Sequence, residues 1–218
     1  MMIKLEKVNK FYDKLHVLKD INLEIEENKF VTIVGPSGAG KTTLLHVIGS
    51  LNKPDSGKVL LENIDVYALS EKKILEFRNR DLGFVFQFHS LLPEFTALEN
   101  VLLPALIAKK SKKEATNKAL SLLDFFGLKN RSMHRPSELS GGEQQRVAVA
   151  RAMINEPKLI IADEPSGNLD SKNAQELHNA FFELRKNFNK TIIMVTHNET
   201  LAKKSDINLH LIDGEISI

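Results

Sequence analysis

Cysteine is absent from this chain of 218 residues, and neither sign of charge dominates. Without cysteine there is no disulfide framework, no thiolate zinc site and no iron–sulfur cluster, so packing alone must stabilise the fold, as in a reduced cytosolic protein. The 30 basic and 28 acidic side chains leave a formal net charge of +2. This balance does not support a nucleic-acid-binding protein that works through bulk positive charge.

Long apolar runs are also absent. Runs such as 159–162 and 192–195 span only a handful of residues, whereas a membrane-spanning helix needs about 20. Residues 1–7 alternate apolar with charged side chains, which predicts a strand and not a signal peptide. We therefore expect any role at a membrane to depend on a partner. The length allows one core of ordinary size, or one core with a smaller lobe.

Three short apolar runs predict buried parallel strands. They cover residues 30–34, 159–162 and 191–195, and the first of them stops at Gly35. Nearly continuous apolar runs of this length are typical of central strands that helices cover on both faces. Together they indicate an α/β fold.

Two further patterns predict antiparallel strands. Apolar side chains alternate with polar ones over residues 21–25, as in a half-buried strand. Near the C-terminus, Asp213-Gly214 separates the apolar alternations 209–212 and 215–218. An Asp-Gly pair in this position predicts a β-hairpin.

The middle of the chain, roughly residues 98–154, has helical patterns. Gly127 near the end of one apolar stripe predicts a helix stop. The lysine-rich run 109–113 predicts a solvated turn between helices, with contact to a membrane surface or a partner as the alternative. The apolar stripe consists of Ala119, Leu122, Leu123, Phe126 and Leu128.

Residues 35–42 fit the pattern G-x-x-x-x-G-K-[ST] and lie between a predicted buried strand and a helix that starts near Thr43. Glycines let a backbone fold tightly around an oxyanion, and a helix N-terminus adds partial positive charge. Lys41 can reach the outer phosphates of a nucleoside triphosphate, and the Thr42 hydroxyl can ligate Mg²⁺. With Thr43, the predicted phosphate-binding residues are Gly35, Pro36, Ser37, Gly38, Ala39, Gly40, Lys41 and Thr42.

Two adjacent acidic residues, Asp163 and Glu164, directly follow the apolar run 159–162. If that strand runs parallel to the strand before Gly35, both strands end at the crevice where open α/β sheets bind ligands. Asp163 then faces the metal ion, and Glu164 is placed to polarise an attacking water. A positioned general base raises a rate by about 10²- to 10⁴-fold. The alternative is that the two acids only cap a helix.

Gly141 and Gly142 lie in the first turn of another predicted helix, between Ser140 and Glu143. Ser140 and Glu143 form a capping box, which by itself indicates an ordinary helix start. Each glycine, however, lowers helix stability by about 1 kcal/mol relative to alanine. The two glycines make sense if backbone N–H groups must approach an anion closely, which again indicates phosphate.

These motifs, and others in the same order, resemble those of the ABC ATPases over essentially the whole chain. The segment from Ser140 to Gln144 is similar to the signature motif of that family. Gln87 resembles the Q-loop glutamine, residues 166–170 resemble the D-loop, and His197 resembles the switch histidine. Tyr12 resembles the A-loop aromatic that stacks on adenine, and the neighbouring Phe11 is the alternative for that role.

The resemblance implies a P-loop NTPase (RecA-like) core of the α/β class, with an antiparallel β subdomain and a helical subdomain. We expect a single ABC ATPase domain over residues 1–218. Its nucleotide-binding core covers 1–87 and 155–218, and its helical subdomain covers about 88–154.

In this family two ATPase subunits pack head to tail and bind two ATP molecules at their interface, so the resemblance implies a homodimer. It implies that Lys41 and Thr42 of one subunit hold the phosphates and Mg²⁺ while the signature motif of the other closes over the γ-phosphate. The implied nucleotide contacts of the signature are Ser140, Gly141, Gly142 and Gln144. The implied catalytic residues are Glu164, Gln87 and His197, and the implied Mg²⁺ ligands are Thr42, Gln87 and Asp163.

Residues 78–101 and 134–138 are similar to the ATPase subunits of lipoprotein-releasing ABC transporters. This resemblance implies integral membrane transporter subunits as partners, no nucleic acid, and a place at the cytoplasmic face of the inner membrane. ATPases of macrolide-type efflux and of cell-division complexes share much of this sequence and are the alternative. DNA-repair and translation ATPases of the superfamily carry tandem domains or a long coiled-coil insertion, for which this chain is too short.

The segment 88–95, directly after Gln87, holds more apolar and aromatic side chains than a solvent-exposed loop would. Two interpretations stay open. Either the segment packs internally between the two lobes, or it forms an exposed groove that receives a helix of a membrane partner.

Overall fold

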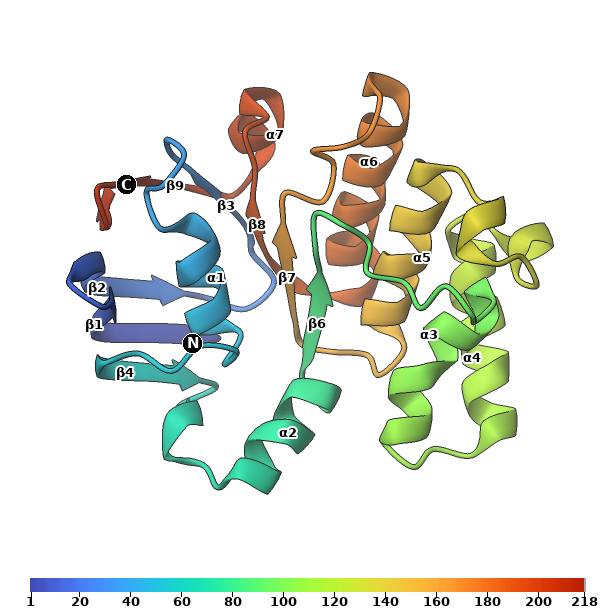
Figure 1. The fold of residues 1–218 in the computed structure, drawn as a ribbon, viewed down its shortest axis with the longest axis horizontal. Coiled ribbons are helices and arrows are strands. Elements are labelled where there is room, and N and C mark those ends of the chain that lie inside the picture. Colours follow the sequence, from blue (N-terminus) through green and yellow to red (C-terminus); the bar gives the residue numbers. More distant parts are fainter. Residues whose placement is uncertain (218) are drawn as a thin grey trace.

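The computed structural model describes residues 1–217 and is built around a six-stranded, largely parallel sheet (Figure 1). The strand order is β10-β9-β3-β8-β7-β6, with an antiparallel β9–β10 pair at one edge. The three predicted parallel strands are confirmed, and β8 lies between β3 and β7. The strands are β3 (Phe30–Val34), β6 (Leu82–Val85), β7 (Leu159–Asp163), β8 (Thr191–Val195), β9 (Ile207–Ile212) and β10 (Glu215–Ser217).

A second sheet of four antiparallel strands has the order β2-β1-β4-β5. In β2, Ile21, Leu23 and Ile25 are buried while the residues between them are exposed, because alternate side chains of a strand point to opposite faces. The predicted N-terminal strand and the predicted antiparallel strand are both confirmed. The strands are β1 (Ile3–Tyr12), β2 (Leu15–Ile25), β4 (Ser56–Leu61) and β5 (Ile64–Asp65).

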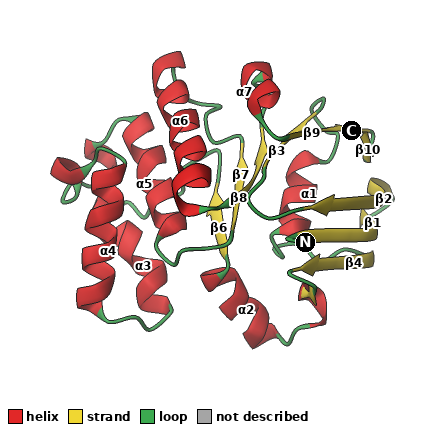
Figure 2. Ribbon diagram, turned by 180° about the vertical axis from the view of Figure 1, so that it is seen from behind, coloured by secondary structure: helices red, strands yellow, loops and turns green. Residues whose placement is uncertain are grey.

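Helices lie on both sides of the larger sheet, with α1 on one side and α3 to α6 gathered on the other (Figure 2). The helices are α1 (Lys41–Ile48), α2 (Glu71–Arg80), α3 (Ala97–Ile107), α4 (Lys112–Phe125), α5 (Gly141–Met153), α6 (Ser171–Phe188) and α7 (Glu199–Lys204). Short 3-10 segments cover Val66–Ala68, Lys129–Arg131 and Pro136–Glu138.

The predicted helix stop at Gly127 is confirmed. The helix α4 ends at Phe125, two residues before Gly127, which has a φ of 70°. The lysine-rich run 109–113 begins in the turn between α3 and α4 and continues into the first residues of α4. Most of its side chains are exposed, as expected of a solvated turn.

The predicted C-terminal hairpin is also present. Asp213 and Gly214 connect β9 to β10 with φ values of 49° and 82°, and two positive φ angles are typical of a tight hairpin turn. The last residue of the predicted hairpin, Ile218, lies outside the described residues. Within residues 1–217, no helix combines the length and the apolar character needed to cross a bilayer.

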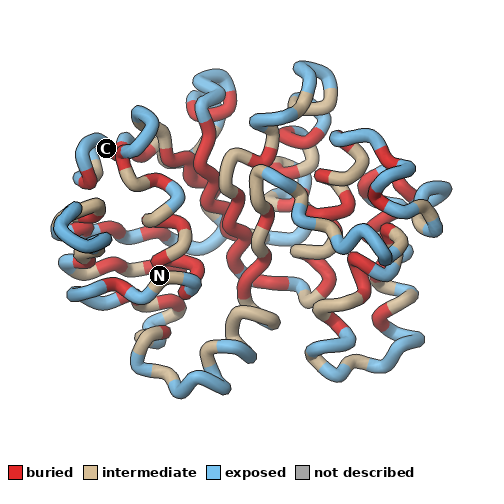
Figure 3. The backbone as a smooth tube through the Cα atoms, viewed as in Figure 1, coloured by how far each residue is buried: buried red, intermediate tan, exposed pale blue. Residues whose placement is uncertain are grey.

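Two clusters of buried apolar side chains occupy the two faces of the parallel sheet. Along β7, Ile160 and Ala162 belong to one cluster, whereas Leu159 and Ile161 belong to the other. This division follows from the alternation of side chains along a strand. The central strands form a continuous buried region of the chain (Figure 3).

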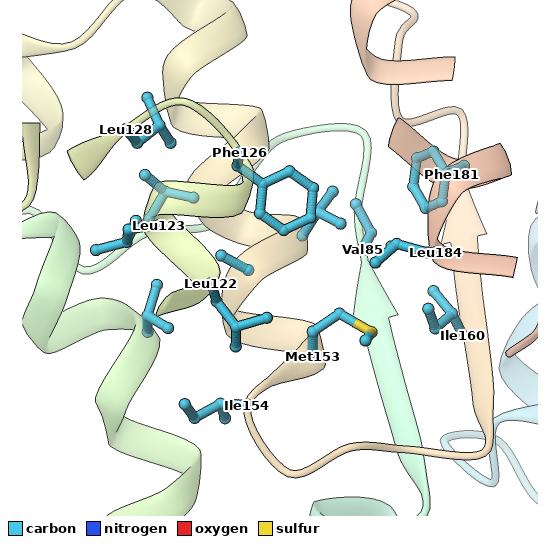
Figure 4. Packing of buried hydrophobic residues seen from close by; sticks show 14 of the residues in the cluster. Val85, Leu122, Leu123, Phe126, Leu128, Met153, Ile154, Ile160, Phe181 and Leu184 are labelled. Atoms are coloured by element: carbon cyan, nitrogen blue, oxygen red, sulfur yellow. The ribbon is translucent and has the colours of Figure 1, made fainter. Parts of the chain in front are cut away.

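The two clusters place α1 and α5 on opposite faces of the sheet. In the first cluster, Leu122 of α4 and Met153 of α5 pack with Ile160 of β7 and with residues of α6 (Figure 4). The second cluster joins Leu44 and Leu45 of α1 to the other face of the sheet and to the antiparallel strands. The loop that follows β3 and the start of α5 are therefore separated by the sheet itself.

Candidate functional site

The predicted phosphate-binding residues form the loop between β3 and the first turn of α1. A Cβ at Gly35 would lie 2.0 Å from the carbonyl oxygen of Leu211, so only glycine fits there. Gly40, directly before α1, has a φ of 100°, in the left-handed region that favours glycine. Because glycine cannot cap a helix with a side chain, the first N–H groups of α1 stay available to an anion.

Lys41 is almost completely buried, at 7% exposure. Its Nζ donates to the carbonyl oxygens of Gly35, at 2.9 Å, and Pro36, at 2.8 Å. The ammonium group therefore lies within the curve of the loop. Phosphate oxygens are stronger partners for this group than neutral carbonyls, because both members of the pair are then charged.

The Thr42 hydroxyl lies beside the carboxyl group of Asp163, at the end of β7. Burial raises the pKa of Asp163, and the neighbouring Thr42 hydroxyl and the positive charge of Lys41 oppose that rise. Hydroxyl and carboxylate oxygens are ligands that Mg²⁺ accepts. The described part of the chain holds no group of three or more metal-binding side chains. Mg²⁺ usually takes one or two protein ligands together with phosphates and waters.

Glu164 and His197 meet at the ends of two adjacent strands, β7 and β8. Glu164 Oε1 lies 2.9 Å from His197 Nε2. The backbone of Glu164 has a φ of 43°, and its N–H donates to the Val195 carbonyl at 3.0 Å. These two residues also line a cavity of about 550 Å³ that extends over the start of α6. The structure thus brings together an acid and a histidine that lie 33 positions apart in the sequence.

Gln87 lies close to the same acid. A Cβ at Gly167 would lie 3.2 Å from Gln87 Nε2 and 3.6 Å from Glu164 Oε2, so both side chains border this glycine. The Gly167 N–H donates to the Glu164 carbonyl at 3.0 Å. Gln87, Glu164 and His197 are therefore gathered at one end of the sheet, beside Asp163.

Two buried polar residues near the site were not assigned a role in the sequence analysis. Gln145 of α5 donates from Nε2 to the Phe86 carbonyl at 2.9 Å and so connects this helix to the segment before Gln87. His178 of α6 has its Nε2 2.8 Å from Ser166 Oγ. For both residues the sequence showed only a polar side chain on an apolar helix face, and this pattern does not indicate what the side chain contacts.

The predicted capping box at the start of α5 is confirmed. The Glu143 N–H donates to Ser140 Oγ at 3.2 Å, and the Ser140 N–H donates to Glu143 Oε2 at 2.8 Å. The Ser140 N–H holds the pKa of Glu143 below its usual value. A Cβ at Gly142 would lie 2.3 Å from Asn173 Oδ1, whereas one at Gly141 would meet nothing closer than 3.8 Å. A side chain at Gly142 would therefore require Asn173 to move, whereas nothing within the chain crowds Gly141.

The start of α5 does not face the phosphate-binding loop of the same chain. Ser140, Gly141 and Gln144 belong to the helix layer on one face of the sheet, and Lys41 begins the helix on the other face (Figure 1). Within one chain, the two segments that were predicted to contact phosphate thus lie apart from each other.

The two aromatic candidates at the end of β1 have different surroundings. The Phe11 ring stacks on the His16 ring, with centroids 4.0 Å apart and an angle of 11° between the planes. Tyr12 is 46% exposed. Phe11 is 41% exposed, and each ring has a neighbour on one face, His16 for Phe11 and Lys10 for Tyr12. The choice of Tyr12 as the residue that meets a flat base therefore stays a prediction.

Part of the segment 88–95 packs internally, and part of it is exposed. Leu91 packs against the helical cluster, whereas Phe88 is 70% exposed. Arg151 of α5 donates to the carbonyl oxygens of Ser90, at 2.8 Å, and His89, at 2.9 Å. A cavity of about 400 Å³ lies beside this segment, between β6, α3 and α5.

Comparison with known proteins agrees with this geometry. Residues 18–167 match the family described as "ABC transporter". The chain is 57% identical to the lipoprotein-releasing system ATP-binding protein LolD of Bacteroides fragilis (strain YCH46), over 99% of this chain and 100% of that protein. It is 56% identical to LolD of Bacteroides thetaiotaomicron, over 99% of both chains. The structure of the ATP-binding cassette MJ0796, described as dimeric and bound to ADP and Pi, matches with a TM-score of 0.91 at 41% identity, over 100% of this chain and 97% of that one. The chain therefore belongs to the ABC transporter family, as an ATP-hydrolysing subunit with a P-loop NTPase core.

Proposed function

We propose that this chain is the ATP-hydrolysing subunit of a transporter that releases lipoproteins from the inner membrane. The observation that carries the proposal is the full-length match to lipoprotein-releasing ATP-binding proteins, at 57% identity over 99% of the chain. Because those relatives are named as parts of a lipoprotein-releasing system, we propose that this chain works at the cytoplasmic face of the membrane, bound to integral membrane subunits.

In this proposal ATP lies with its phosphates against the loop 35–42. Lys41 exchanges its two carbonyl partners for phosphate oxygens, and the first N–H groups of α1 stabilise the negative charge. Phosphoryl transfer depends mainly on positioning and electrostatic stabilisation. Mg²⁺, when bound, neutralises phosphate charge, and Thr42, Asp163 and Gln87 are the residues that would hold it.

Glu164 is the proposed general base. Its carboxylate lies beside His197 and Gln87, where it can accept a hydrogen bond from a water. It takes up a proton as that water attacks the γ-phosphorus, the bond from this phosphorus to the bridging oxygen breaks, and ADP leaves. His197 Nε2 lies 2.9 Å from Glu164 Oε1, and in this proposal His197 holds the carboxylate in place and contacts the γ-phosphate. Each of these roles uses a contact between residues at the ends of adjacent parallel strands.

We further propose that each ATP lies between two copies of this chain. The signature residues Ser140, Gly141, Gly142 and Gln144 lie across the sheet from the loop 35–42. A second copy turned head to tail brings its Ser140 to the loop of the first copy, and the same rotation completes the second site. The dimeric state of the related cassette MJ0796 supports this arrangement.

The proposed contact with the membrane subunits is the surface around 88–95. The cavity beside this segment is lined by Phe84, Pro104 and Ile107, and Ile107 and Phe88 are 63% and 70% exposed. Apolar side chains exposed around a recess are typical of a groove that receives a partner helix. Arg151 connects the groove to the signature helix α5. A displacement of the segment 88–95 can therefore be transmitted through α5 to the nucleotide.

Isolation of the complex from membranes tests the proposed cargo. We expect a tagged chain, extracted in mild detergent, to bring integral membrane subunits with it, and the reconstituted complex to release a lipoprotein from vesicles only when ATP is present. Recovery with an efflux or division-type partner, without release of a lipoprotein, would contradict the proposal. A Glu164→Gln complex, which should bind ATP and release nothing, is the control for dependence on hydrolysis.

A further inference from the structure

The loop 52–55, between α1 and β4, holds the end of β1 at which Tyr12 lies. The Asp55 N–H donates to the Asn9 carbonyl at 2.9 Å, and the Asp55 carboxylate accepts the N–H of Phe11 at 2.7 Å. This second hydrogen bond holds the pKa of Asp55 below its usual value, so the carboxylate stays charged at neutral pH. Asp55 therefore holds the backbone that leads into Tyr12 by two hydrogen bonds, one that it donates and one that it accepts.

The Tyr12 ring itself is held by Asn52. Asn52 Nδ2 donates to Tyr12 Oη at 2.9 Å. The backbone carbonyl of Asn52 in turn accepts the hydroxyl of Tyr67 at 2.5 Å, and the same hydroxyl lies 2.8 Å from the Val47 carbonyl. Burial raises the pKa of Tyr67, so its hydroxyl stays protonated and remains a donor.

These contacts connect the aromatic ring to the phosphate-binding loop. Val47 lies near the end of α1, and Lys41 is the first residue of the same helix. The spacing between a nucleotide's base and its phosphates is limited by its covalent structure. A ring that is fixed to one end of α1 therefore keeps a constant position relative to phosphates bound at the other end.

One face of the Tyr12 ring already has a neighbour. Lys10 Nζ lies 5.6 Å from the ring centroid, and Lys10 is itself held by a hydrogen bond to the Lys53 carbonyl at 2.9 Å. The ring is nevertheless 46% exposed. It can therefore offer its other face to a flat base.

We propose that Asn52 is a positioning residue for recognition of the purine base of ATP. Its amide fixes the Tyr12 ring in the orientation on which the base stacks, and Asp55 fixes the backbone that carries the ring. Neither residue contacts the nucleotide in this proposal. The inference rests on the proposed function, because it requires ATP phosphates at the loop 35–42.

The test compares ATP with inorganic tripolyphosphate, which has the same phosphates and no base. In the full chain, Asn52→Ala should weaken ATP binding by about 2- to 10-fold, the effect of one hydrogen bond. Binding of tripolyphosphate should stay unchanged, and so should kcat at saturating ATP. Tyr12→Phe keeps the ring and removes the hydroxyl, so it should weaken ATP binding to a similar extent.

The double variant separates positioning from a general loss of structure. If Asn52 acts through the Tyr12 hydroxyl, Asn52→Ala combined with Tyr12→Phe should bind ATP no more weakly than either single variant. Additive losses, or an equal loss of ATP and tripolyphosphate binding, would overturn the inference. Unchanged ATP binding by Asn52→Ala would overturn it as well.

Tyr12→Ala distinguishes failure of this inference from failure of the proposed function. Loss of ATP affinity in Tyr12→Ala but not in Asn52→Ala rejects the positioning role and keeps Tyr12 as the stacking residue. Unchanged ATP affinity in Tyr12→Ala rejects both roles while ATP hydrolysis stands. A parent chain that binds neither ATP nor tripolyphosphate rejects the proposed function together with this inference.

Discussion

Glu164 occupies a backbone conformation that few residues with side chains adopt. Its φ is 43°, and its N–H and carbonyl are held by Val195 and Gly167. These contacts turn the chain sharply after β7, so that Asp163 stays beside Thr42 while the carboxylate of Glu164 reaches His197. Unusual backbone conformations of this kind persist only where the surrounding structure holds them.

We expect Glu164→Gln to lower the ATP turnover of the purified chain by about 10²- to 10⁴-fold, because glutamine can hold a water but cannot take its proton. ATP binding should be kept, since Lys41 and the loop around it are untouched. Steady-state phosphate release measures the first effect, and equilibrium binding of ATP measures the second.

Glu183→Gln, on the exposed side of α6, is the matched control and should hydrolyse ATP like the parent. If Glu164→Gln also kept the parental turnover, Glu164 would not be the base.

His178 predicts a pH dependence of stability. It is 3% exposed, and burial, followed by the charge of Lys204, lowers its pKa in the folded state. Between that lowered pKa and the ordinary value of about 6.5, the unfolded chain binds more protons than the folded one. The free energy of unfolding should therefore fall as the pH falls through about 6.5.

We expect His178→Gln to have a shallower pH dependence, because glutamine does not titrate. Chemical denaturation at several pH values above and below about 6.5 measures the difference. Equal slopes for the parent and the variant would show that His178 is not the titrating group.

At the scale of elements, local signals located some segments and not others. The strands β3, β7 and β8 were predictable because both of their faces are buried, so their sequences are continuously apolar. Two elements were not predictable from local patterns: β4, which starts with exposed residues, and α6, whose apolar residues are spread among polar and charged ones. These elements are fixed mainly by the surface against which they pack.

The start of α3 repeats the capping arrangement of α5. Thr96 Oγ1 accepts the Glu99 N–H at 3.2 Å, and Glu99 Oε2 accepts the Thr96 N–H at 2.8 Å. We expect Thr96→Ala to lower the free energy of unfolding by about 1 kcal/mol, since it removes one half of the box. Chemical denaturation measures the loss. Thr116→Ala, inside α4, removes no cap and should change the stability less; an equal loss would argue against the capping role.

At the scale of the whole molecule, the opposite placement of α1 and α5 determines what two copies can do together. In the proposed dimer, the loop 35–42 and the residues Asp163 and Glu164 belong to one half of each site, and Ser140 belongs to the other half. If each site takes one half from each chain, two different inactive variants can complement each other.

We expect a mixture of Lys41→Ala and Ser140→Arg chains to regain ATPase activity that neither variant has alone. In the mixed dimer, the loop of the Ser140→Arg chain meets the intact signature of the Lys41→Ala chain. The mixture should reach about a quarter of the parental rate, because half of the random dimers are mixed and each has one intact site. Phosphate release before and after mixing measures the gain.

Lys41→Ala mixed with Glu164→Gln is the control. Both of these changes lie in the same half of the site, so no mixed dimer has an intact site and no activity should return. No gain with Lys41→Ala and Ser140→Arg would contradict the shared sites.

The division into a core at 1–87 and 155–218 and a helical subdomain at about 88–154 stays a proposal. Its boundaries fall between β6 and α3 and between α5 and β7. One apolar cluster crosses both boundaries and joins the helices to the sheet (Figure 4).

The sequence by itself determined the local chemistry. The loop 35–42, the acid pair at 163–164 and the helix start at 140–143 are contiguous, and their backbone preferences and capping depend on near neighbours only. The tertiary structure decided which of these groups meet. The order of the strands sets Glu164 against His197, and the packing of α1 brings Asn52 to Tyr12. Such contacts join residues far apart in the sequence, and their geometry depends on strand order and helix packing, which local patterns do not specify.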